Sequence, residues 1–121
     1  FLGDASRVAG LLKLHPGLAR TVDGRGDHPI LHAARNGDTD IVKLLLEAGA
    51  DANSVNPRGH TVLYCAGGHG HVETVRLLLQ YGSDPRTKFT RDGKDLMQWL
   101  SQFPNDSRFL KVVQALQEHL G

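Results

Sequence analysis

The stretch DGRGDHPILHAARNGDTDIVKLLLEAGADANSV, residues 23–55, decides the fold because the chain repeats it immediately. Residues 56–88 read NPRGHTVLYCAGGHGHVETVRLLLQYGSDPRTK and align with the first segment, without a gap, at a period of 33 residues. The coinciding positions include three glycine pairs and a leucine run: Gly26 with Gly59, Gly37 with Gly70, Gly49 with Gly82, and 44–46 with 77–79. A period of this length indicates an array of stacked supersecondary units.

Incomplete copies flank these two segments. Residues 3–20 align with the second half of a unit, and residues 95–103 and 109–121 occupy the places of its two apolar stretches, after one inserted residue. We therefore predict a single domain over residues 1–121. Its parts are a partial N-terminal unit (1–22), two complete units (23–55 and 56–88) and a degenerate capping unit (89–121). The chain does not begin with methionine, so we expect a fragment of a longer protein.

The first half of each complete unit predicts a short helix. Pro29 opens the apolar stretch of the first unit, and proline suits the first turn of a helix because its missing N–H would have no partner there. Thr61 stands before the matching stretch and can cap that helix through its hydroxyl. Gly37 and Gly70 are expected to end these helices in a positive-φ conformation.

The second half of each unit predicts a longer amphipathic helix, from about residue 39 to 48 in the first unit, which Gly49 stops. Its apolar positions cover one broad face, and charged residues lie on the other side. The segment 51–59 is rich in turn-forming residues and predicts a projecting loop or hairpin. Small residues at Ala33, Ala34 and Ala66 let helices and units approach closely, which a stacked array requires.

This pattern resembles the ankyrin repeat. The resemblance rests on G-x-H-P-I-L-H-A-A, then G-D-x-x-I-V-K-L-L-L-x-x-G-A-D-A-N, and covers residues 4 to about 120. It implies an all-α solenoid of stacked helix-turn-helix units with projecting hairpin loops. His28 departs from the family's threonine, Val62 from its proline, and Leu31 and Tyr64 from its histidine.

The resemblance implies a protein-interaction module that binds a protein or peptide along its concave side, inside a larger scaffold, ubiquitin ligase, kinase or transcriptional regulator. Such a domain is expected in the cytoplasm or nucleus, without a membrane or a small-molecule substrate. Residues at the hairpin tips and exposed inner-helix positions would contact the partner: Arg25, Asp27, Arg35, Asn36, Arg58, His60, His69, Arg91, Gln102 and Phe103.

The basic residues of the hairpins suggest an acidic partner. Arg25, Arg58 and Arg91 recur at intervals of 33, and guanidinium groups bind carboxylates in a forked geometry. Aligning the glycines instead places Asp92 opposite Arg58, and loop arginines can also serve only as a solvated surface. A nucleic acid or another polyanion bound by the basic third hairpin is the alternative, as is a structural spacer. The formal net charge of +1 makes nucleic acid the less favoured partner.

The chemistry-bearing residues do not predict an enzyme or a cofactor. His60, His69 and His71 lack further ligands at metal spacing, so no metal site is expected. The glycine-rich segment 67–70 lacks the lysine and the preceding strand of a phosphate-binding loop. Cys65, the one cysteine of the chain, is expected to be a buried small apolar residue rather than a nucleophile.

Two further features have alternative interpretations. Asn53 lies in a segment similar to asparaginyl-hydroxylation sites of ankyrin repeats, but hydrogen bonding within the hairpins is the preferred role. Trp99, Met97 and Phe109 have the spacing of a core-filling cap, whereas Phe103 is expected at the edge of an inner helix, where it could reach a partner.

Overall fold

The computed structural model describes residues 5–120. The described elements are α1 (Ala5–Leu14), the 3-10 helix η1 (Pro16–Arg20), α2 (Pro29–Asn36), α3 (Thr39–Glu47), α4 (Val62–Gly67), α5 (Val72–Gln80), α6 (Leu96–Leu100) and α7 (Ser107–Leu120). Within this range the only β pairing is an isolated bridge between Val55 and Thr61, at the base of a hairpin. The prediction of an all-α chain is therefore confirmed. Residues 1–4 of the predicted partial unit and residue 121 of the capping unit lie outside this range.

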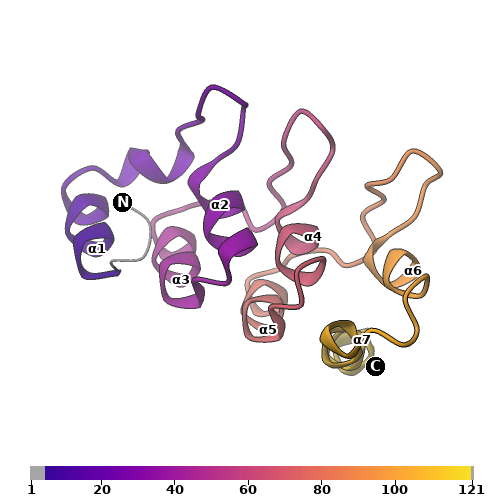
Figure 1. The fold of residues 1–121 in the computed structure, drawn as a ribbon. Helices are drawn as coiled ribbons and strands as arrows, with labels where there is room; N and C mark the ends of the chain where they lie inside the picture. Colours follow the sequence, from indigo (N-terminus) through magenta and orange to yellow (C-terminus); the bar gives the residue numbers. More distant parts are fainter. Residues whose placement is uncertain (1–4, 121) are drawn as a thin grey trace.

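The helices form two rows (Figure 1). The short inner helices α2, α4 and α6 lie on the side from which three hairpins project, and α1, α3, α5 and α7 form the outer row. Each inner helix packs against the next one, and the outer helices pack both on their own inner helix and on one another. The arrangement is the stacked array that the 33-residue period predicts.

A continuous apolar core runs between the rows. Its largest fully buried side chains come from both rows and from every unit: Val8, Ile30, Leu31, Ile41, Val42, Leu45, Val62, Val75, Leu78, Leu96, Leu100 and Leu116. Ala33, Ala34 and Ala66 have no exposed surface, in agreement with their predicted role at the close contact between α2 and α4. One helix pair could not bury this much apolar surface alone, so the stability of each unit depends on its neighbours.

The ends of the inner helices follow the glycine pattern with one exception. Gly37 closes α2 with φ +73°, in the left-handed conformation that glycine adopts without strain. Gly70 adopts the predicted positive φ, +77°, but it does not end α4, because that helix already ends at Gly67 and is capped by Gly68 with φ −69°. Gly67 also allows α6 to approach, since a Cβ atom there would lie 2.7 Å from Leu96 Cδ2.

The two central units begin their inner helices differently. The Thr61 hydroxyl accepts a hydrogen bond from the Tyr64 amide at 3.0 Å, as predicted for a helix cap. His28 makes no such cap in the preceding unit, and its Nδ1 lies 3.0 Å from the carbonyl oxygen of Thr21 instead. The departure of His28 from threonine therefore removes one capping interaction from α2.

None of the helices among residues 5–120 is both long and apolar enough to cross a bilayer.

Candidate functional site

The three hairpins share one turn geometry. Asp23, Asn56 and Thr90 occupy equivalent positions, and each side-chain oxygen accepts the amide hydrogen bond of the residue four positions later, at 3.0, 2.9 and 2.7 Å. These bonds hold the tips that project beside α2, α4 and α6. We use the term hairpin face for the surface formed by residues 23–27, 56–60 and 90–94 together with the exposed side chains of the inner helices.

The turn geometry fixes which hairpin residues are equivalent. Gly26, Gly59 and Gly93 each donate a backbone hydrogen bond to the residue three positions earlier and have φ between +75° and +85°. In this register Asp92 corresponds to Arg25 and Arg58. The predicted arginine ladder is therefore wrong at Arg91, because the inserted residue shifts the third hairpin by one position. Lys94 also forms an ion pair with Asp92, which reduces the free positive charge of that tip.

Asp27 does not lie on the exposed surface as the resemblance implied. Only 2% of the residue is accessible, and its Oδ1 accepts a hydrogen bond of 2.9 Å from the side-chain amide (Nδ2) of Asn56 in the next hairpin. Its Oδ2 accepts no hydrogen bond and lies 3.7 Å from Arg58 Nη2 and 3.9 Å from Arg35 Nη1. Asp27 is thus a buried anion that links two units and attracts two cations of the hairpin face.

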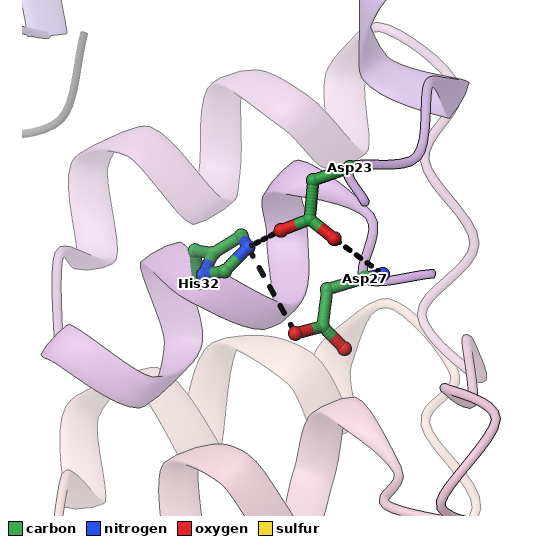
Figure 2. Close-up of side chains that lie close together, drawn as sticks. All are labelled: Asp23, Asp27 and His32. Carbon is green, nitrogen blue, oxygen red and sulfur yellow. Dashed lines mark hydrogen bonds and ion pairs between the residues drawn. The ribbon is translucent and has the colours of Figure 1, made fainter. Parts of the chain in front are cut away.

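A second carboxylate lies beside this anion (Figure 2). Asp23 Oδ2 is 2.6 Å from His32 Nε2, and Asp23 Oδ1 accepts amide hydrogen bonds from Arg25 and Asp27. These bonds, the one with His32 first, lower the pKa of Asp23 from 3.8 to about 2. The Asp23 carboxylate is therefore ionised throughout the physiological range and fastens the first hairpin to α2.

Asp23, Asp27 and His32 together have the residue types of a divalent-cation site, which the sequence did not reveal. Their candidate ligand atoms lie within 4.8 Å of one another. However, His32 Nε2 is already engaged by Asp23, and the guanidinium groups of Arg35 and Arg58 supply positive charge within 3.9 Å of Asp27 Oδ2. Because a bound cation would be repelled by both guanidinium groups, we interpret the cluster as a charge network that shapes the hairpin face.

Arg35 and Arg58 form the exposed part of this network, which we call the cationic pair. The Arg58 side chain is 52% exposed and that of Arg35 is 28% exposed. Both share one carboxylate oxygen at distances too long for hydrogen bonds, so each retains donors for another anion. His60 lies next to the pair: burial lowers its pKa, and the charges of Arg58 and Arg35 lower that pKa further.

The remaining predicted contacts lie at the ends of the inner helices. Asn36, His69 and Gln102 are exposed, and Phe103 is 41% exposed. Arg25 is also exposed and makes no ion pair with the described residues. The structure therefore places most of the predicted residues on one face, while their role in binding stays a prediction.

An aromatic cluster lies at the C-terminal end of the hairpin face. Tyr64 contacts His60, Phe89 and Trp99 with ring centroids 5.0, 4.5 and 5.2 Å apart, and Trp99 continues to Phe103 at 5.0 Å. We call Tyr64, Phe89, Trp99 and Phe103 the aromatic ledge. Trp99 is only partly buried, so the prediction of a core position holds less well for Trp99 than for Phe109, which is 4% exposed. The sequence did not indicate that Tyr64 and Phe89 would join this cluster.

The residues that the sequence analysis considered as a nucleophile, metal ligands or a hydroxylation site are buried or form hydrogen bonds within the domain. Cys65 is 1% exposed, and burial raises the pKa of its thiol, as expected for an apolar role. His71 Nε2 lies 2.9 Å from the Arg35 carbonyl and joins two units, whereas His69 Nδ1 lies 2.8 Å from the Cys65 carbonyl. Asn53 donates to the Gly82 carbonyl and accepts from the Asp84 amide, which is the hairpin role preferred for it.

Comparison with known proteins identifies the repeat. A family model for ankyrin repeats matches residues 3–89 in three copies. The NAD-capped RNA hydrolase NUDT12 of Homo sapiens is 39% identical over 54 residues, which is 45% of this chain and 12% of that protein. The protein named Probable E3 ubiquitin-protein ligase XBOS33, from Oryza sativa subsp. japonica, is 49% identical over 55 residues, 45% of this chain and 11% of its own length. The match thus spans about a tenth of each relative, and the activities in their names belong to those proteins.

Proposed function

From the premise that the chain belongs to the ankyrin-repeat family, whose domains are typically non-catalytic protein-interaction modules, we propose that it binds a partner protein through the hairpin face. The observation that carries this proposal is the cationic pair. Arg35 and Arg58 lie on two adjacent units, both within 3.9 Å of the buried Asp27 Oδ2, and their side chains are 28% and 52% exposed. Two neighbouring guanidinium groups on one surface suit a macromolecular partner that carries carboxylates.

The partner class follows from the charges. Two guanidinium groups lie within 3.9 Å of Asp27 Oδ2 without a hydrogen bond to it, so both can offer donors to an incoming anion. A partner carboxylate can complete this arrangement with charge-assisted hydrogen bonds, which are about twice as strong as neutral ones. We therefore favour an acidic segment of a protein over a neutral one.

The setting of the domain is part of the proposal. We propose that it is part of a larger protein of the cytoplasm or nucleus, such as a scaffold, a ubiquitin ligase, a kinase or a transcriptional regulator. Its single cysteine is reduced and buried, which suits a reducing compartment. The ligase name of one relative is compatible with this setting.

A capture experiment tests the proposal. Immobilised domain would be exposed to cell lysate beside the double variant Arg25→Glu/Arg58→Glu, and captured proteins would be identified by mass spectrometry. The matched control is Lys43→Glu/Lys111→Glu, which reverses two exposed charges on α3 and α7 of the outer row. We expect the hairpin-face variant to lose a protein that the parent and the control both retain, with circular dichroism showing that all three are folded. Equal capture by the hairpin-face variant, or loss only in the control, would place the binding surface elsewhere.

A further inference from the structure

We propose that the hairpin face recognises an extended peptide segment with two features: a carboxylate side chain, and an aromatic or large aliphatic side chain about five or six residues away. The carboxylate would bind the cationic pair, and the apolar side chain would pack on the aromatic ledge. This inference rests on the proposed function and assigns the partner's chemistry and spacing within it.

The cationic pair provides the first subsite. Arg35 comes from the last turn of α2 and Arg58 from the second hairpin, so the subsite spans two units. Asp27 Oδ2 attracts both guanidinium groups but makes no hydrogen bond to either one, and Arg35 Nη2 also donates to Cys65 Sγ. A carboxylate that approaches from solvent meets Arg58, which is 52% exposed, and then Arg35. Such preformed donors reduce the entropy lost on binding.

The aromatic ledge provides the second subsite. Five of the six aromatic side chains (Phe, Trp, Tyr) in the described range form one contact network: Tyr64, Phe89, Trp99, Phe103 and Phe109. Phe109 is buried, whereas Phe103 remains 41% exposed just beyond the end of α6, at the repeat position that corresponds to Asn36 and His69. Trp99 lies behind Phe103 with the ring centroids 5.0 Å apart. Rigid, partly exposed rings of this kind are typical anchors for apolar side chains at interfaces.

The surface between the two subsites is formed by His60 and Tyr64 and by a glycine. His60 lies beside the cationic pair, and its ring is 5.0 Å from that of Tyr64 and tilted by 54°, so contacting side chains join the two subsites. Gly68, which caps the end of α4, occupies the repeat position that corresponds to Arg35 and places no side chain between the subsites.

The spacing of the two peptide features follows from the stacking. Arg35 belongs to the first complete unit and Phe103 to the capping unit, two units further along the stack. Two helix spacings of about 8–10 Å each therefore separate them. An extended chain advances about 3.3 Å per residue. A peptide that runs across the inner helices therefore covers this distance with about five or six residues.

A peptide selection tests the inference. The whole domain would be used to select from a displayed library of random 16-residue peptides, and selected peptides would be measured by fluorescence anisotropy. We expect enriched sequences to share an acidic residue and an aromatic or large aliphatic residue about five or six positions apart. Their affinity should fall about tenfold or more with Arg58→Glu and also with Phe103→Ala. It should change less than twofold with the outer-row controls Lys43→Glu and Leu110→Ala, which alter exposed residues of α3 and α7.

The possible failures are distinguishable. Peptides that lose affinity with Arg58→Glu but not with Phe103→Ala, or that lack the expected spacing, overturn this inference and leave the proposed function standing. Peptides that are insensitive to both substitutions but lose affinity with an outer-row control overturn both proposals. A selection that enriches no sequence counts against the inference, because a preformed two-part site should favour at least the peptides that carry both features.

Discussion

At the scale of single residues, Asp27 has a structural role between two units that its position in the repeat does not predict. In the structure it is buried between two hairpins, accepts a hydrogen bond from Asn56 and faces two arginines. Asp27→Ala would leave the Asn56 amide without its acceptor and remove the carboxylate from Arg35 and Arg58. We expect the free energy of unfolding to fall by about 1–3 kcal/mol, measured by urea denaturation. The exposed Asp40→Ala should change it by about 0.5 kcal/mol or less; equal effects of the two would mean that the network adds no net stability.

The Asp23–His32 contact also belongs to the residue scale and gives a pH prediction. The pKa of Asp23 is lowered to about 2, first by the His32 hydrogen bond and then by the amides of Asp27 and Arg25. A lowered folded-state pKa means that the stabilisation is present above the unfolded value and is lost as the pH falls from about 4 toward 2. Carboxyl-carbon NMR should find a midpoint near pH 2. His32→Leu should raise that midpoint part of the way to 3.8, because the amide donors remain, while His69→Leu should leave it unchanged; a midpoint near 3.8 in the parent would show that the contact does not form.

At the scale of elements, helix termination depends on glycine for two separable reasons. Gly37 ends α2 at φ +73°, and a Cβ atom there would lie 2.6 Å from His71 Nδ1. Gly82, after α5, has φ +94° but open space around it. Gly82→Ala should therefore lower the free energy of unfolding through backbone strain alone, by about 1–2 kcal/mol. Gly37→Ala should cost more, since His71 must move and its contact with the Arg35 carbonyl weakens. Thermal unfolding followed by circular dichroism would measure both; a larger cost at Gly82 would contradict the steric argument.

The elements also show what the sequence could predict and where it could not. Apolar periodicity and glycine spacing located the helices of the two central units closely, because these features act within a few residues of the chain. The end of α4 was predicted too late, and the need for a glycine at position 67 arises from Leu96 of another unit, which would clash with a Cβ atom there. The shift of Arg91 was one of two alignments that the sequence left open, and the turn at Gly93 decides between them. The burial of Asp27 depends on Asn56 from the next unit. Local pattern therefore predicted the fold, whereas the site depends on contacts between units.

At the scale of the whole molecule, stability should be shared along the stack because each unit buries its apolar face against the next. Trp99, the single tryptophan, lies in the last helix pair and reports on that end of the array. Ile41, 1% exposed in α3, lies in the first complete unit. We expect Ile41→Val to lower the free energy of unfolding by about 0.5–1.5 kcal/mol. Trp99 fluorescence and far-ultraviolet circular dichroism should report the same decrease, because destabilising one unit removes support from all.

Whether the unfolding transitions seen by Trp99 fluorescence and by circular dichroism coincide tests the prediction that the units unfold together. Leu110→Ala, at a position 56% exposed on α7, is the control and should shift neither transition by more than about 0.5 kcal/mol. A Trp99 transition that stays in place while the circular dichroism transition broadens or splits would show that the units unfold separately. Coincident shifts would mean that the array unfolds as one body. In that case the cationic pair and the aromatic ledge, which together span three successive units, keep their relative positions until the whole domain unfolds. A fixed distance is what recognition of a defined peptide spacing requires.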